Sequence, residues 1–263
     1  MKIARILTPQ GATVTVTENN GRLERLEGSP YGAPKPTGEF VEAARWLPPV
    51  DPSMLICIGL NYRKHAVECN LPIPEQPVVF MKNIECAIGH EQPILVPKVC
   101  EDELDFECEL AIVIGAPCRD VPKEKALDYV LGYTVANDVS ARLWQMKRGG
   151  SQWCRGKSFD TFAPMGPFLV TAGEIPNPDN LAIKTVLNGD TVQDSNTSDM
   201  IFDVRTIISF LSQDTTLRPG TVILTGTPEG IGWTREPKSL LHSGDSVSIT
   251  IENIGTLTNP VRA

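Results

Sequence analysis

Alternating apolar and polar positions run through much of the chain and predict many short β-strands. The segments ATVTVT and RLERLE alternate on the two sides of Asn20-Gly21. An Asn-Gly pair between two alternating segments is typical of a tight β-hairpin, because both residues accept a positive φ angle. Asn188-Gly189, within VLNGDTVQ, predicts a second hairpin of the same kind.

Two segments have features of helices instead. In DVRTIISFLSQ, apolar residues recur at helical spacing after Asp203, which is a candidate N-cap. VPKEKALDYVLG carries Pro122 near its start and Gly132 after its end, as helices often do. Strands outnumber helices, so the sequence predicts a mostly β or α+β fold with peripheral helices, not a doubly wound sheet.

The chain of 263 residues fits one large domain, or one domain with a small appendage. The proline-rich stretch LPPVDPS closes the first group of predicted strands. We therefore predict a small N-terminal β unit at residues 1–50 and a main domain at residues 51–263.

Composition indicates which binding partners to expect and in which cellular compartment the protein lies. The net charge of -8 gives the chain no general attraction for nucleic acid or for an anionic membrane. The seven cysteines are odd in number and form no C-x-x-C pair, which is typical of free thiols in a reducing compartment. No apolar run approaches the ~20 residues that span a bilayer. We expect a cytoplasmic protein, with a mitochondrial location left open.

Residues 105–115, DFECELAIVIG, bring three carboxylates into an apolar segment. Alternate side chains of a strand share a face, so Asp105, Glu107 and Glu109 are expected to point the same way. A solvated acidic face is the simpler interpretation, but the apolar run that follows is typical of a strand buried on both faces. Asp138 comes directly after another apolar strand.

If Glu107, Glu109 and Asp138 converge, each pair repels by about 4 kcal/mol at ~4 Å and an effective dielectric near 20. Such a cluster must take up a proton or hold a cation. Ligation by carboxylate oxygens alone suits Mg²⁺ or Mn²⁺, and less strictly Ca²⁺. The sequence therefore predicts a site for a hard divalent metal.

His65 and Glu68 are three residues apart and would be neighbours on one helical turn. A surface helix with an incidental pair is the simpler interpretation, but a glutamate beside a histidine can also orient a general base. Lys157 lies among aromatic residues, in QWCRGKSFDTFAPMGP, which makes a partly buried functional lysine plausible. The glycine-rich TGTPEGIG lacks the ending of a phosphate loop and is better interpreted as backbone approaching a small ligand.

The sequence resembles the fumarylacetoacetate hydrolase superfamily, and most of all its compact members, the fumarylacetoacetate hydrolase domain-containing proteins. The resemblance covers roughly residues 52–260. It rests on six motifs in the family's order: GLNYRKHAVE, PVVFMK, DFECELAIVIG, GYTVANDVSAR, QWCRGKSFDTFAPMGP and VILTGTPEGIG. The resemblance implies a mixed β-sandwich roll and a homodimer.

The resemblance also implies roles for individual residues. The metal ligands would be Glu107, Glu109 and Asp138, and His65 with Glu68 would activate water. Lys157 would act at the substrate, and the remaining substrate-binding positions would be Arg142, Gln145, Thr227 and Lys82. Family members commonly have an acid directly after the arginine of SAR, where this chain has Leu143. One hypothesis is an unpaired Arg142 and a pocket that favours dicarboxylic or bulkier acids. The simpler interpretation is that Leu143 packs on a neighbouring helix and Arg142 pairs with another acid.

The expected function is divalent-metal-dependent hydrolysis of a C–C bond in a small acylpyruvate-like 2-oxo acid, through a metal-stabilised enolate. Keto–enol tautomerisation or decarboxylation of oxaloacetate, or isomerisation of a dienoate, would use the same enolate and remains an alternative. A second alternative is a non-catalytic member that binds a metal or an oxo acid.

Overall fold

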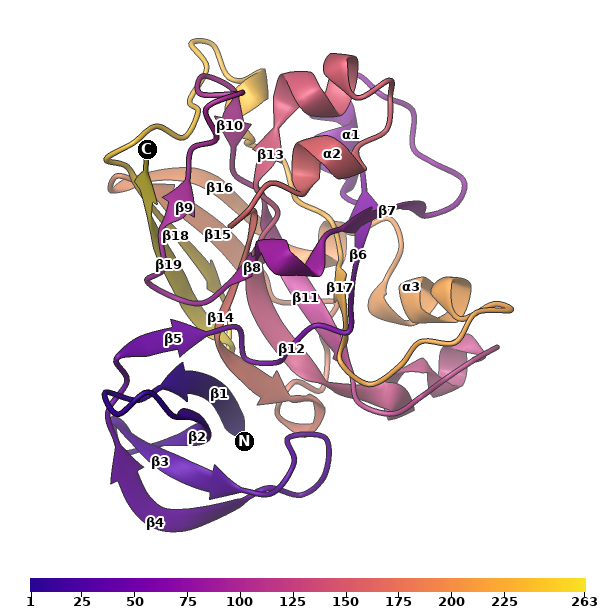
Figure 1. Cartoon of the computed structure of the whole chain (residues 1–263). Helices are drawn as coiled ribbons and strands as arrows, with labels where there is room; N and C mark the ends of the chain where they lie inside the picture. The colour runs from indigo at the N-terminus through magenta and orange to yellow at the C-terminus, as the bar shows by residue number, and fades with distance from the viewer.

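The computed structural model describes residues 1–263, and strands make up most of its regular structure. Figure 1 shows the N-terminal strands gathered at one end of the molecule and helices α1 and α2 at the opposite end. The predicted mostly β fold with few helices is confirmed. No helix is both long and apolar enough to cross a membrane.

The N-terminal strands form one arm of a twelve-stranded sheet. Their bounds are β1 (Lys2–Leu7), β2 (Thr13–Asn19), β3 (Arg22–Glu27), β4 (Lys35–Val41) and β5 (Arg45–Leu47). The first predicted hairpin is confirmed, since β2 and β3 pair on either side of Asn20 and Gly21, whose φ angles are 52° and 76°. This arm has its own cluster of four buried residues: Ala4, Ile6, Val14 and Val16.

The rest of the large sheet carries the main core. Its strands are β6 (Met54–Gly59), β7 (Val78–Lys82), β8 (Ala87–Ile88), β11 (Cys108–Ile114), β12 (Val130–Asn137), β14 (Ala163–Thr171) and β17 (Thr221–Leu224). Every residue of β11 is buried, as the uninterrupted apolar run predicts. β14 also pairs with β1, so the two arms of the sheet are continuous.

A five-stranded sheet packs against this core. It consists of β9 (Ile94–Leu95), β15 (Ala182–Leu187), β16 (Asp190–Asn196), β18 (Ser246–Ile251) and β19 (Gly255–Arg262). β15, β18 and β19 lie against β11, β12 and β14, which gives a two-layered β arrangement. The second predicted hairpin is confirmed between β15 and β16, with Asn188 and Gly189 at φ angles of 51° and 95°. β10 (Leu104–Asp105) and β13 (Ser140–Ala141) form a separate pair.

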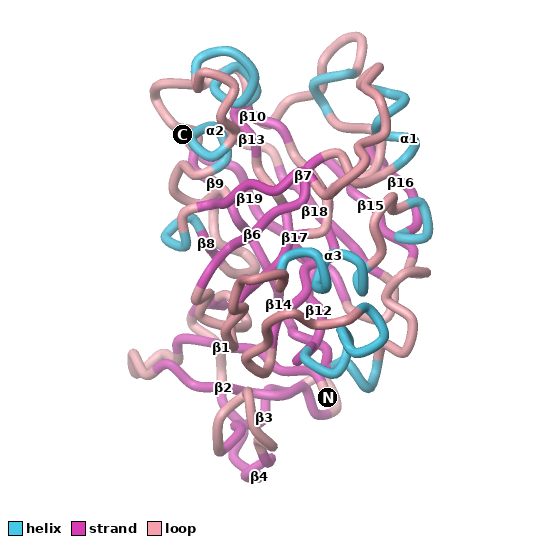
Figure 2. The backbone as a smooth tube through the Cα atoms, turned by 90° about the vertical axis from the view of Figure 1, so that its right-hand side faces the viewer, coloured by secondary structure: helices cyan, strands magenta, loops and turns pink.

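Helices are short and lie around the strands (Figure 2). The α-helices are α1 (Arg63–Glu68), α2 (Cys154–Lys157) and α3 (Val204–Leu211), and a π-helical turn covers Trp144–Arg148. Short 3₁₀ helices cover Ile84–Cys86, Lys123–Tyr129, Ala172–Glu174, Thr197–Asp199 and Gly232–Thr234. The helix predicted after Pro122 is thus of the 3₁₀ type, and no side chain caps its start.

The predicted N-cap of α3 is confirmed, because the side chain of Asp203 accepts a 2.7 Å hydrogen bond from the Thr206 amide. Asp203→Ala should lower the free energy of unfolding by about 1 kcal/mol, since that amide loses its acceptor. Asp203→Asn keeps an acceptor oxygen and should cost much less. Urea denaturation of the two variants measures the difference, and equal stabilities would show that the cap contributes nothing.

Candidate active site

Most of the predicted site residues meet in one pocket of about 160 Å³. Eight of them line it: His65, Glu107, Glu109, Asp138, Arg142, Gln145, Lys157 and Thr227. The other two lie directly behind the wall, where Glu68 contacts His65 and Lys82 contacts Asp138. The apolar part of the lining includes Phe80, Trp153 and Ile231.

The register of two antiparallel strands brings the three predicted metal ligands together. Cys108 of β11 is opposite Asn137 of β12, so the residues just outside this pair, Glu107 and Asp138, are also opposite each other. The Asp138 amide donates to the Glu107 carbonyl at 3.0 Å. Carboxylate oxygens of Glu107, Glu109 and Asp138 all lie within 4.8 Å of one another, and these residues are at most 5% exposed.

This donor set fits a hard divalent cation. Three buried carboxylates offer oxygen ligands only, which Mg²⁺ and Mn²⁺ prefer, and the adjoining pocket leaves room for water or a substrate oxygen. The residues that would hold such an ion are Glu107, Glu109 and Asp138.

Two buried lysines pair with two of the three carboxylates. Lys157 Nζ lies 2.7 Å from Glu107 Oε2 and 2.8 Å from Asp138 Oδ2, and Lys82 Nζ donates to Asp138 Oδ1. Burial raises the pKa of Glu107, but Lys157 and Arg142 outweigh it and hold this pKa at about 2. Glu107 is therefore ionised across the physiological range.

Glu109 has no cationic partner within ion-pair distance, and its ionised form is destabilised by burial and by the neighbouring carboxylates. It accepts one hydrogen bond, from the Gly226 amide at 2.7 Å. Burial, followed by the charges of Asp138 and Glu107, raises the pKa of Glu109 well above its usual range. Burial and the neighbouring carboxylates therefore favour the protonated form of Glu109.

Arg142 pairs with acids other than one at position 143, as the simpler interpretation of Leu143 predicts. Its Nε donates to Asp105 Oδ2 at 2.8 Å, and its Nη1 donates to Glu107 Oε1 at 2.6 Å. Nη1 also donates to Gln145 at 3.0 Å. Asp105, on β10, and Glu107 are therefore the acidic partners of Arg142.

The single strand expected over residues 105–114 is broken, because side chains take the backbone amides at the break. The Phe106 amide donates to Asp105 Oδ1 at 2.9 Å, and the Glu107 amide donates to Asn137 Oδ1 at 3.0 Å. The Cys108 amide donates to Gln193 Oε1 at 3.0 Å. Asp105 consequently belongs to β10 and serves Arg142 instead of joining the carboxylate cluster.

The loop over residues 225–235 directs its backbone amides at the carboxylates of the site. Gly226 donates to Glu109, Gly230 donates to Glu68 at 2.9 Å, and Gly232 donates to Asp105 at 2.8 Å. Gly226 and Gly230 have φ angles of 97° and 96°, which other residues rarely adopt. The glycine-rich pattern here therefore serves to position acidic side chains.

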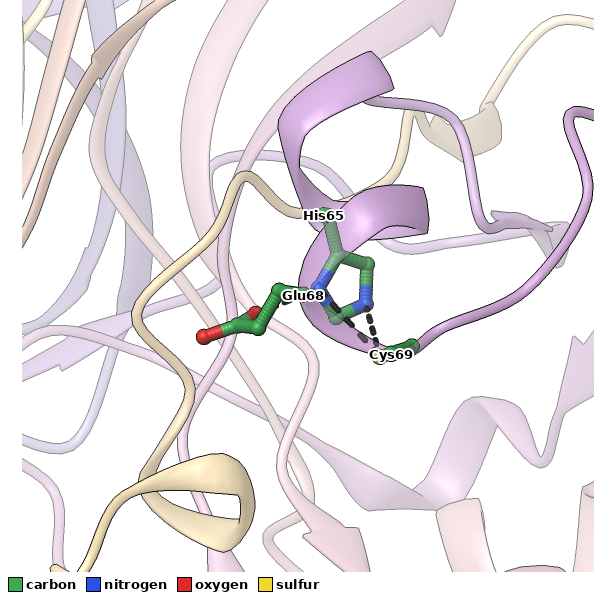
Figure 3. A group of neighbouring side chains, drawn as sticks. All are labelled: His65, Glu68 and Cys69. Atoms are coloured by element: carbon green, nitrogen blue, oxygen red, sulfur yellow. Dashed lines mark hydrogen bonds and ion pairs between the residues drawn. The ribbon is translucent and has the colours of Figure 1, made fainter.

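His65 and Glu68 lie on one turn of α1, as their spacing predicts. His65 Nδ1 is 2.9 Å from Glu68 Oε2, and Glu68 Oε1 accepts from the Thr234 hydroxyl at 2.8 Å. Burial lowers the pKa of His65, but hydrogen bonds with Cys69 and Glu68 outweigh it and raise this pKa to about 9. Figure 3 shows the side chains of His65, Glu68 and Cys69 together.

Sequence reasoning gave no role to three residues that shape the site, although it named Asp105 among the carboxylates that enter the interior. Asp105 holds Arg142, and Cys69 Sγ lies 3.7 Å from His65 Nδ1. Gln193 is buried and donates to the Thr227 hydroxyl at 2.9 Å, which fixes that side chain. Only Cys69 had a local signal, since it is four residues after His65 on the same turn.

The chain belongs to the fumarylacetoacetate hydrolase family, whose C-terminal domain model, fumarylacetoacetate (FAA) hydrolase C-terminal, matches residues 54–262. A second family model, Rv2993c-like, N-terminal, matches residues 1–49. The predicted family is therefore confirmed.

Several relatives are similar over much of the chain. It is 48% identical to "Oxaloacetate tautomerase fahd2, mitochondrial" of Xenopus laevis, over 81% of this chain and 67% of that protein. It is 43% identical to "Protein Rv2993c" of Mycobacterium tuberculosis, over 99% of this chain and 98% of that protein. The structure of 2-hydroxyhepta-2,4-diene-1,7-dioate isomerase from Mycobacterium marinum superposes with a TM-score of 0.85 at 40% identity, covering 100% of this chain and 98% of that one.

The raised pKa of Glu109 predicts how stability depends on pH in the presence of a chelator. The folded chain binds this proton more tightly than the unfolded chain does, so stability should fall as pH rises from ~4.3 through the folded-state pKa. Saturating Mg²⁺ or Mn²⁺ should reduce that loss. Melting temperatures with chelator and with metal, measured across this pH range, test the prediction.

Glu109→Gln is the matched control for this measurement. The amide has nearly the same shape as the acid but does not titrate, so the variant should lose both the pH-dependent destabilisation and most of the stabilisation by metal. A Glu109→Gln protein with an unchanged pH profile and an unchanged response to metal would contradict the assignment.

Proposed function

We propose that this protein is an enzyme that catalyses keto–enol tautomerisation of a small dicarboxylic 2-oxo acid of the oxaloacetate type. The observation that carries the proposal is the hydrogen-bonded His65–Glu68 pair, which faces the same small pocket as the three buried carboxylates. Two names support it: a relative called an oxaloacetate tautomerase and a neighbouring structure called a dienedioate isomerase. Both reactions move a proton along a conjugated oxo acid.

The proposed cofactor is Mg²⁺ or Mn²⁺, held by Glu107, Glu109 and Asp138. When bound, this ion would act as a Lewis acid toward the oxygens of a 2-oxo acid. Lys157 contacts two of these carboxylates and lines the pocket, so it would keep their oxygens in place and add positive charge beside an anionic substrate. Ca²⁺ would fit the same oxygens less strictly.

His65 is the residue proposed to transfer the proton. Its Nδ1 is engaged by Glu68, which leaves Nε2 to exchange a proton with the substrate. With a pKa of about 9, the imidazole is protonated at neutral pH and is suited to protonate the carbon atom of an enol. Glu68 would fix the orientation of the ring and stabilise its protonated form before the transfer, and the hydroxyl proton of the enol would restore that form afterwards.

The pocket is suited to a small acid. Its volume of about 160 Å³ is below the ~300–1,000 Å³ typical of sites for drug-sized ligands. Arg142 and Lys157 supply positive charge in the wall, and Gln145 and Thr227 supply neutral polar groups. We propose that these four residues recognise the carboxylates of the substrate.

Hydrolysis of a C–C bond in an acylpyruvate-like acid is the second candidate. One feature favours it: the imidazole of His65 paired with a carboxylate is also the arrangement that activates water. This reaction needs the neutral imidazole, so it should be slow below the pKa of His65 and should accelerate as pH rises toward 9.

A substrate comparison separates the two candidates. Enol oxaloacetate and an acylpyruvate are each mixed with the Mg²⁺-loaded protein, and loss of enol absorbance and release of pyruvate are followed. We expect ketonisation of the enol to be accelerated much more than C–C cleavage. Faster cleavage of the acylpyruvate would favour the hydrolase, and no acceleration of either reaction would contradict both.

His65→Ala should lower the rate of tautomerisation by about 10²–10⁴-fold, because the proton-transferring group is lost. Its affinity for Mg²⁺ should stay close to that of the unchanged protein, because His65 is not one of the proposed metal ligands. Val67→Ala, on the same helix but with a side chain exposed to solvent, is the matched control and should retain full activity. If His65→Ala releases Mg²⁺, the division of roles is wrong.

A further inference from the structure

Part of the lining of the active-site pocket is apolar, and the proposed tautomerisation gives it no role. Three side chains, which we call the apolar wall, belong to this part: Leu60, Phe80 and Trp153. Leu60 directly follows β6, Phe80 lies on the neighbouring strand β7, and Trp153 directly precedes α2. An acid of the oxaloacetate type is polar at nearly every position and offers little apolar surface to these side chains.

The apolar wall lies directly beside a residue proposed to recognise the substrate. The Phe80 ring centre is 5.2 Å from Lys157 Nζ, and the Phe80 and Trp153 rings form a T-shaped pair with their centres 5.5 Å apart. Trp153 also covers Gly59, where an added Cβ atom would lie 2.2 Å from the indole ring. A group attached to the substrate can therefore meet the apolar wall while a carboxylate stays beside Lys157.

Leu60 enters the pocket from an unfavourable backbone conformation. Its φ angle is 51°, and it is the only apolar residue of the chain with a positive φ. This left-handed conformation is uncommon for leucine, because the Cβ atom approaches the following carbonyl oxygen. Glycine would adopt the same conformation without strain. What leucine adds at this position is an apolar side chain that lines the pocket.

The next residue, Asn61, keeps the strained backbone in place. Asn61 Nδ2 donates to the Thr225 carbonyl at 2.7 Å and to the Phe202 carbonyl at 3.1 Å, and Oδ1 accepts from the Phe202 amide at 2.9 Å. Leu60 therefore lies between the end of β6 and a residue that is fixed on both faces of its amide. Strain of this kind persists where the surrounding structure imposes it, and it is concentrated at ligand-binding sites.

We propose that Leu60, Phe80 and Trp153 form a subsite for a short alkyl group, so that the preferred substrates are 2-oxo acids with such a group on carbon 3. This inference deepens the proposed function and rests on it. In ketonisation, carbon 3 gains a proton from His65 and the enol hydroxyl gives up its proton, while the bond from carbon 3 to the alkyl group stays intact. The apolar wall adds affinity for the alkyl group and takes no part in the proton transfer.

A pair of substrates tests the subsite. The enols of oxaloacetate and of 3-methyloxaloacetate are compared by kcat/KM with the Mg²⁺-loaded protein. The methylated acid should be preferred about fourfold, because it buries one further CH₂ equivalent. A protein without this preference would contradict the proposal.

Leu60→Asn makes the wall polar at one position. Asparagine is close to leucine in size and tolerates the left-handed conformation, so the backbone should be kept while the preference for the methylated acid is lost. Ile84→Asn is the matched control, because it makes the same exchange at a 42% exposed side chain outside the pocket and should keep the preference. A full preference in Leu60→Asn would remove Leu60 from the subsite and overturn the inference.

Binding of oxamate and N-ethyloxamate provides a readout that is independent of turnover. Both carry an amide nitrogen in place of carbon 3, so neither can enolise. Calorimetric titration of the Mg²⁺-loaded protein should show about tenfold tighter binding of N-ethyloxamate, and Leu60→Asn should reduce this difference.

The two readouts separate the subsite from the proposed function. If N-ethyloxamate is preferred but neither enol is converted, the proposed function fails and the subsite stands. If the enols are converted but neither the methylated acid nor N-ethyloxamate is preferred, the subsite fails and the proposed function stands.

Discussion

The structure depends on the pairing of buried carboxylates with buried cations, which offsets the repulsion between the carboxylates. Around the carboxylate cluster, three buried cations form ion pairs with three of four buried acids, and the acid without an ion pair is Glu109. The acids are Asp105, Glu107, Glu109 and Asp138, and the cations are Lys82, Arg142 and Lys157. Two unit charges ~4 Å apart repel by about 4 kcal/mol at an effective dielectric near 20, a large share of a domain's stability. Binding of a proton or of a divalent cation would relieve this repulsion, and the raised pKa of Glu109 reflects it.

The surrounding strands and helices hold the buried carboxylates in place. The antiparallel register of β11 and β12 sets Glu107 opposite Asp138. This register is fixed by backbone pairing along the two strands. The buried lysines reach the carboxylates from β7 and α2. These contacts connect parts of the chain that are far apart in the sequence.

Local sequence patterns predicted those features that depend on neighbouring residues. Both Asn-Gly hairpins, the Asp203 cap and the His65–Glu68 pair follow from spacing within one turn of the chain. The pairing of Arg142 with Asp105 did not follow, because it depends on a break in the strand. At this break the side chains of Asp105, Asn137 and Gln193 accept hydrogen bonds from the backbone amides. The sequence allowed for an acidic partner of Arg142 outside position 143, but it could not identify that partner as Asp105.

The loop over residues 225–235 has a consequence for how this site can diverge. It holds Glu109, Glu68 and Asp105 mainly through main-chain amides, which every residue except proline possesses. Its side chains at Ile231 and Trp233 face the pocket and take no part in those three contacts. Substitutions there can reshape substrate preference while the acidic groups keep their positions. Within this loop, the positions that hold the acidic groups are therefore distinct from the positions whose side chains line the pocket.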